Sequence, residues 1–203
     1  MARGRTNNNE KRVQMVRLLW TFRYFLAIRP CYKLLEGLTM HADYEDGVLK
    51  LPDGKELTPR NLYWHAFEVI KGRWSEAEPI IMEEPHIAYY YARHIINGRW
   101  PEAEPHIMKN PEWASYYAKY IIKGRWPEAE PIIMKDGFVV NGYAEDVIKD
   151  RWPEAEPIIM EDPCRAYKYA RDVIKGRWPE AEPIIMEDPG QWRHYCKHFD
   201  ISE

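Results

Sequence analysis

Hydrophobic and polar residues recur along most of the chain with a period of 26 residues. Five tryptophans mark this period, and each is the third residue of a near-copy of the phrase GRWPEAEPIIM: Trp74, Trp100, Trp126, Trp152 and Trp178. A period in this range is typical of solenoid-like arrays, in which each repeat packs on its neighbours. The pattern therefore predicts an all-α solenoid of helical pairs, about five and a half repeats over residues 59–203.

The longer half of each repeat has the pattern of an amphipathic helix. In residues 110–124, Asn110 suits the N-cap, Pro111 the first helical position and Gly124 a left-handed C-terminal cap. Counted from that proline, apolar residues stand at offsets 3, 6, 7, 10 and 11, on one helical face. In this repeat they are Ala114, Tyr117, Ala118, Ile121 and Ile122. We expect this stripe to be buried.

The shorter half of each repeat is the phrase itself. Pro127 and Pro131 suit a helix start, and Glu128 and Glu130 suit its first turn, where the helix dipole favours negative charge. We expect about two turns of helix, partly of the 3₁₀ type.

The array extends beyond the five phrases at both ends. Residues 59–72 match the longer half one period upstream, and Pro189 opens a last long helix that ends the array. In the third repeat Gly137 replaces the proline and Gly142 lies in mid-helix, which predicts a weaker helix or one that starts late.

Residues 1–58 lie outside the repeat. We expect a disordered tail over 1–9 and a basic helical segment over 10–58 that caps the array. Turn signals at Asp46–Gly47 and Asp53–Gly54 predict one small β-hairpin near residues 44–57.

Charge is unevenly distributed along the chain. Its net charge is only −3, which argues against a protein whose whole surface binds nucleic acid, but residues 1–40 carry eight Lys or Arg against two Glu. Nucleic-acid binding by this basic segment is therefore one alternative function. The residues that would carry it are Arg3, Arg5, Lys11, Arg12, Arg17 and Arg23.

Membrane insertion and disulfide formation are not expected. The apolar stretch 16–28 is short and contains Arg17 and Arg23, so it does not predict a transmembrane helix. Three widely separated cysteines are typical of a reducing compartment. We expect a soluble protein of the cytoplasm.

Catalysis is not predicted. Paired glutamates can transfer protons, but five copies on successive layers do not make one active site, and the arginine that precedes each tryptophan suggests a ladder of structural ion pairs. Each tryptophan is interpreted as a wedge between repeats. His194, Cys196 and His198 are close together, yet Cys196 falls on the buried stripe and no second ligand pair completes a zinc site. We expect no metal, no cofactor and no enzyme activity.

Function is expected at the positions that differ between repeats. Offsets 1, 5 and 9 of the long helices, with adjacent aromatic residues, form a face away from the core. Exposed aromatic side chains are typical of protein interfaces, whereas unconstrained drift would also make the repeats differ. The predicted protein-binding residues are Tyr89, Tyr90, His94, Trp113, Tyr116, Tyr120, Phe138 and Lys168.

Residues 150–178 read DRWPEAEPIIMEDPCRAYKYARDVIKGRW, which resembles a tandem repeat of uncharacterised phage and large-virus proteins. The resemblance covers about residues 59–200 and implies a viral, all-helical repeat protein without a settled activity. Small phage proteins often bind and block host proteins, so it implies an inhibitor of a host enzyme or an antiviral-defence protein, acting in the host cytoplasm. A structural or self-assembling viral component, hence a homo-oligomer, is the other alternative.

Overall fold

The computed structural model describes residues 43–45, 48–51 and 55–201. The chain divides into two compact units, Met1–Leu57 and Thr58–Glu203. The predicted tail 1–9, most of the predicted capping segment 10–58 and the six basic residues proposed for nucleic-acid binding lie outside the described residues.

In the first unit, two short strands form an antiparallel hairpin. Strand β1 (Asp43–Glu45) pairs with β2 (Val48–Lys50), with Asp43 opposite Lys50. The hairpin therefore begins one residue before the predicted range, and both predicted turns lie outside the described residues.

The second unit is an all-α solenoid of 26-residue helical pairs, as predicted. Each long helix is a seven-residue α-helix continued by a five-residue π-helix. These are α3 (Pro59–His65) with η1 (Ala66–Ile70), α5 (Pro85–Tyr91) with η2 (Ala92–Ile96), α7 (Pro111–Tyr117) with η3 (Ala118–Ile122), α9 (Gly137–Tyr143) with η4 (Ala144–Ile148), and α11 (Pro163–Tyr169) with η5 (Ala170–Ile174). The last long helix, α13 (Pro189–Phe199), is α-helical throughout.

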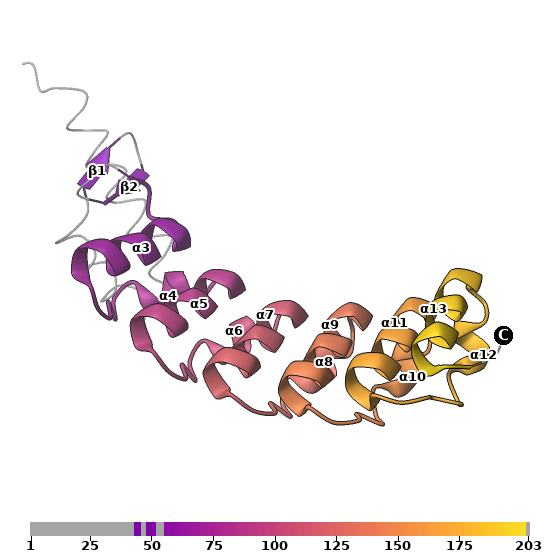
Figure 1. The fold of residues 1–203 in the computed structure, drawn as a ribbon. Helices are drawn as coiled ribbons and strands as arrows, with labels where there is room; N and C mark the ends of the chain where they lie inside the picture. The colour runs from indigo at the N-terminus through magenta and orange to yellow at the C-terminus, as the bar shows by residue number, and fades with distance from the viewer. Residues whose placement is uncertain (1–42, 46–47, 52–54, 202–203) are drawn as a thin grey trace, which may run out of the picture. The chain divides into compact units, whose positions relative to one another are not determined.

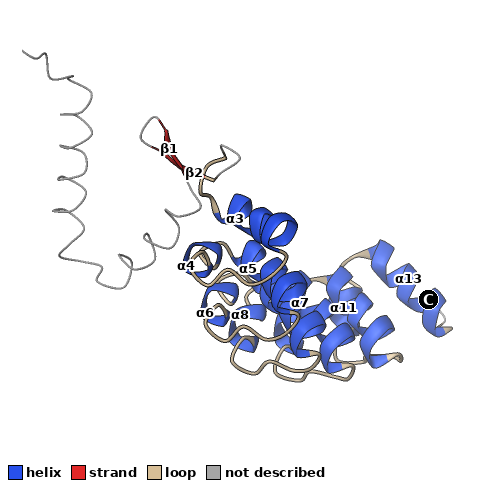
Figure 2. Cartoon of the chain, turned by 90° about the vertical axis from the view of Figure 1, so that its left-hand side faces the viewer, coloured by secondary structure: helices blue, strands red, loops and turns tan. Residues whose placement is uncertain are grey.

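Short helices alternate with the long ones and form a second row (Figures 1 and 2). They are α4 (Glu78–Ile81), α6 (Glu104–Ile107), α8 (Glu130–Ile133), α10 (Glu156–Ile159) and α12 (Glu182–Ile185). Each long helix packs on the next long helix and on the short helices before and after it. Each short helix consists of one α-helical turn, and a 3₁₀-type turn precedes it. Before α8, for example, the Ala129 N–H donates to the Trp126 carbonyl.

A side-chain cap precedes every long helix except α5, where Glu84 makes no capping hydrogen bond. Asn110 Oδ1 accepts the N–H groups of Glu112 and Trp113, and Pro111, which has no N–H, occupies the first helical position. Helix α9 has Gly137 in place of the proline but begins in the same register, so the predicted late start is wrong. The physical reason is that Asp136 caps the N–H groups of Phe138 and Val139 without needing the proline.

The five long helices that continue as π-helices end in π-turns that place a lysine or asparagine, and not the glycine, in the left-handed conformation. Lys123 has φ 60°, and its N–H donates to the Ala118 carbonyl at 2.7 Å. Gly124 donates to the same carbonyl at 3.3 Å and is not left-handed. The prediction of a left-handed Gly124 is therefore wrong, because the wide turn closes one residue earlier. For the same reason Asp150 can replace this glycine in the third repeat.

We predict that only one of two neighbouring substitutions to a smaller or larger residue in this turn changes the stability. Lys123→Gly should raise the free energy of unfolding by about 0.5 kcal/mol, because a left-handed L-residue costs about 1–2 kcal/mol and glycine returns part of that as unfolded-chain entropy. Gly124→Ala should change it by less than about 0.5 kcal/mol, because an added Cβ meets no atom within 4 Å. Urea denaturation of both variants measures this. A clear loss of stability in Gly124→Ala alone would contradict the assignment.

The core of the array lies on part of the predicted stripe. Offsets 3, 6 and 7 are buried, since Ala114 and Tyr117 of α7 and Ala118, the first residue of η3, have no exposed surface. Ile121 and Ile122, at offsets 10 and 11, are only half-buried, which corrects the prediction. Both lie in the π-helix η3, whose wider turn rotates them relative to an α-helical stripe.

Candidate functional site

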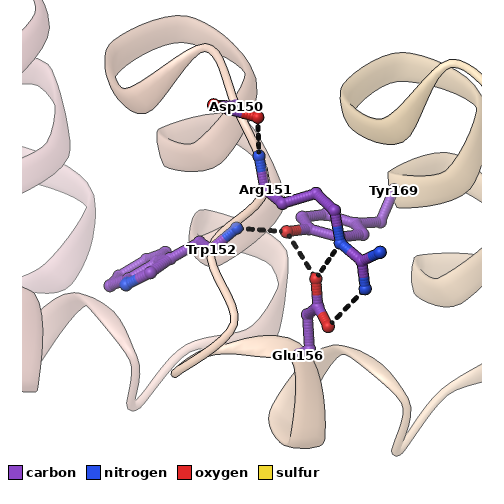
Figure 3. Close-up of polar contacts among 5 residues, drawn as sticks. All are labelled: Asp150, Arg151, Trp152, Glu156 and Tyr169. Atoms are coloured by element: carbon purple, nitrogen blue, oxygen red, sulfur yellow. Dashed lines mark hydrogen bonds and ion pairs between the residues drawn. The ribbon is translucent and has the colours of Figure 1, made fainter.

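The repeated phrase forms one hydrogen-bonded node in every layer. Figure 3 shows the node around Tyr169. Its hydroxyl accepts the backbone N–H of Trp152 at 2.6 Å and donates to Glu156 Oε1 at 3.4 Å. Glu156 in turn accepts Nε and Nη2 of Arg151 at 2.8 and 2.9 Å, a bidentate pair. The node therefore joins one phrase to the long helix that follows it.

The same node recurs around four further tyrosine hydroxyls, those of Tyr91, Tyr117, Tyr143 and Tyr195. In each, the arginine before the tryptophan pairs with the second glutamate of the phrase, five residues later. This confirms the predicted ladder of ion pairs. Burial raises the pKa of the node tyrosines, to about 12 for Tyr143 and Tyr169, because the phenolate would lose its solvation.

The tryptophans are wedges between long helices, as predicted. Trp126 is 2% exposed. Its ring lies 5.1 Å from that of Tyr117 in the preceding long helix, and its backbone N–H donates to the hydroxyl of Tyr143 in the next. Equivalent ring contacts recur along the array, and each joins a tyrosine of a long helix to the tryptophan nine residues later. His65 replaces the tyrosine in the first layer, with its ring 5.3 Å from Trp74. The phrase is thus structural.

A different set of rings gathers on the first three long helices. We call it the aromatic face: Tyr63, Trp64, Phe67, Tyr89, Tyr90, His94, Trp113, Tyr116 and Tyr120. Ring contacts link all of its members, with centroid separations from 5.2 to 6.4 Å. The face runs from α3 and η1 over α5 and η2 to α7 and η3.

Four large rings of this face are accessible to solvent. The exposed fractions are 45% for Trp64, 39% for Phe67, 37% for Tyr116 and 41% for Tyr120. Tyr90 and Trp113 are half-buried. Such side chains are ordinarily withdrawn from water, and a contiguous exposed group of them is typical of an interaction surface.

Tyr89 does not belong to the accessible part of the face. It is 2% exposed, because the rings of Trp113 and Tyr116 lie 5.5 and 6.2 Å from it on the neighbouring helix. The prediction that Tyr89 contacts a partner is therefore corrected: this side chain supports the face from below.

Polar groups lie among these rings. The Tyr63 hydroxyl and His94 Nδ1 are 2.9 Å apart, which joins α3 to η2. Burial, with the nearby charge of Arg93, lowers the pKa of His94, so its neutral form is favoured. Arg93 donates to the Tyr89 hydroxyl, and its Cζ lies 4.5 Å from the Tyr120 ring centroid.

Two predicted residues lie further along the array. Phe138, on α9, is 75% exposed, and the Arg165 guanidinium lies 6.0 Å from its ring. Lys168 is exposed on α11. In the described part of the chain, no aromatic ring contact joins Phe138 to the aromatic face.

Tyr63, Trp64 and Phe67 of the aromatic face are not among the predicted protein-binding residues, all of which lie between positions 89 and 168. A signal was available for one of them. Offset 5 from Pro59 is Trp64, the same position that holds Tyr90 and Tyr116 in the next two helices.

The described residues offer no support for a metal site or a membrane span. His194 and His198 are exposed while Cys196 is buried on α13. Over residues 43–45, 48–51 and 55–201, no group of three metal-ligating side chains occurs. No described helix is long and apolar enough to cross a bilayer.

Comparisons of the chain with protein-family models, curated proteins and solved structures find no match.

Proposed function

We propose that this protein is a protein-binding repeat module whose aromatic face contacts its partner. The observation that carries the proposal is the linked set of rings over α3, α5 and α7, four of which are substantially exposed. Tryptophan and tyrosine are enriched among the residues that dominate binding energy at protein interfaces. The nodes at Tyr91 and Tyr117 tie α5 and α7, two of the helices that carry the face, to the phrases that precede them.

The resemblance to viral repeats adds a finer hypothesis, inhibition of a host enzyme or an antiviral-defence protein. A surface that binds through apolar rings can block a partner by covering it, without any reaction of its own. If the partner is an enzyme, its activity assay with and without this chain tests that hypothesis directly.

The binding experiment compares the chain with a variant that removes three exposed rings, Trp64→Ser, Tyr116→Ser and Tyr120→Ser. Proteins captured from lysate of the presumed host cell are identified, purified and titrated by calorimetry. We expect the variant to bind at least about tenfold more weakly, a difference of about 1.4 kcal/mol.

Met186→Ser is the matched control, since Met186 is 49% exposed but lies at the end of α12, on the row of short helices. Circular dichroism should show both proteins folded. Equal affinity of the parent, the triple variant and the control would refute the assignment of the aromatic face.

A further inference from the structure

One arginine lies unpaired among the rings of the aromatic face. Arg93 is exposed at the start of η2, donates through Nη1 to the Tyr89 hydroxyl, and has its Cζ 4.5 Å from the Tyr120 ring centroid. Because Tyr89 is buried, its hydroxyl is a stationary acceptor that orients the guanidinium.

Most other arginines of the array are neutralised by carboxylates. The node arginines pair with glutamates, Arg165 with Glu161 and Asp162, and Arg171 with Asp172. Lys119, beside Tyr120, pairs with Asp146 at 2.6 Å. Among the described residues Arg93 has no ion pair, and it alone of the unpaired arginines lies over aromatic rings.

We propose that the aromatic face binds a protein segment that presents an aspartate or glutamate carboxylate to Arg93, with apolar side chains on either side against the exposed rings. This rests on the protein-binding function proposed above. With Nη1 used by Tyr89, the Nε and Nη2 donors remain in a fork that matches the two oxygens of a carboxylate. A bound segment that covers the surrounding rings would exclude water from this pair and so strengthen it.

The charge of the array favours a protein segment over a nucleic acid. Residues 58–203 contain 19 Lys and Arg against 25 Asp and Glu, a net charge of −6. Nucleic-acid binding depends on neutralising many phosphates, and this unit would repel a polyanion. A single carboxylate flanked by apolar side chains needs only the one unpaired guanidinium.

The test uses a display library of random dodecapeptides selected on the full chain. We expect enriched peptides to carry one Asp or Glu between aromatic or aliphatic residues. Their affinity should fall about 10- to 100-fold with Arg93→Gln, as for the loss of a charged hydrogen-bonded pair. Arg193→Gln, at another exposed arginine, should leave it unchanged.

A double comparison isolates the pair. Replacing the peptide's acidic residue with Asn should weaken binding to the parent chain and should cost nothing further in Arg93→Gln. Arg93→Glu should select peptides with Lys or Arg instead. Circular dichroism and thermal melting of each variant establish that it is folded.

Each other outcome overturns the inference in a recognisable way. Peptides without an acid that still need Trp64, Tyr116 and Tyr120 would refute the role of Arg93 and leave the protein-binding function standing. Failure to enrich any peptide that depends on those rings would count against both. Binding of labelled oligothymidylate at the face, or an Arg93-dependent dimer by light scattering, would assign another occupant.

Discussion

Replacing Trp126 with alanine is expected to lower the free energy of unfolding by about 3–5 kcal/mol, the range for removing a large buried ring. The Trp126 ring is 2% exposed and packs on the Tyr117 ring, so alanine at this position would leave a cavity in a close-packed core. This loss is a large part of the roughly 5–15 kcal/mol that stabilises a typical domain. Guanidinium denaturation followed by circular dichroism measures it.

Trp64→Ala is the matched control, because the same ring is 45% exposed there. We expect that substitution to cost no more than about 1 kcal/mol. Trp126 also joins two layers, so its loss should let the two halves of the array unfold separately and broaden the transition. Equal losses at Trp64 and Trp126 would show that the tryptophan of the phrase is not the wedge described above.

The array is expected to lose stability steeply at alkaline pH. Burial raises the pKa of Tyr143 and Tyr169 to about 12, whereas an unfolded tyrosine titrates near 10. The unfolded chain therefore releases the phenolic proton first. Stability is complete below about pH 10 and falls as the pH rises to about 12, by about 1.4 kcal/mol per pH unit for each such tyrosine.

Tyr143→Phe separates this effect from the titration of the lysines, which both proteins share. At pH 7 the free energy of unfolding of the variant should be lower by about 1–3 kcal/mol, because the buried backbone N–H of Trp126 loses its acceptor. Between pH 10 and 12 its stability should fall less steeply than that of the parent. Parallel curves from urea denaturation at successive pH values would contradict the role of the buried hydroxyl.

The repeat architecture could be predicted because each layer carries the same local signals. The prolines, the caps and the apolar offsets agree with one another, and the arginine and glutamate of each phrase lie only five residues apart. The tyrosine hydroxyl could not be placed in the node, since its partners lie 13 and 17 residues away and belong to the preceding phrase.

The ends of the long helices could not be predicted from periodicity. In a regular α-helix, offsets 10 and 11 would lie on the same face as offsets 3, 6 and 7, so the sequence predicts that Ile121 and Ile122 are buried. The π-helix moves them off this face. A glycine after a helix favours the left-handed conformation on average, but Lys123 adopts it here because the wider turn ends earlier.

The sequence indicates which helices carry the aromatic face, but it does not indicate which of its rings are buried. Tyr89 and Tyr90 are adjacent in sequence and both aromatic, yet Tyr89 is buried and Tyr90 is only half-buried. Trp113 of the next repeat contacts both rings, whereas Tyr116 contacts Tyr89. Spacing along one helix does not reveal which rings the neighbouring helix shields.

The node has a consequence for how this protein can change length. Every node joins a tryptophan to the tyrosine 17 residues later, so its partners recur whenever a 26-residue block is copied in frame. Gene duplication or deletion of one block would therefore leave each remaining interface complete, without compensating substitutions. Evolution and protein engineering can thus lengthen or shorten the array one layer at a time, while the face on the first three layers is kept.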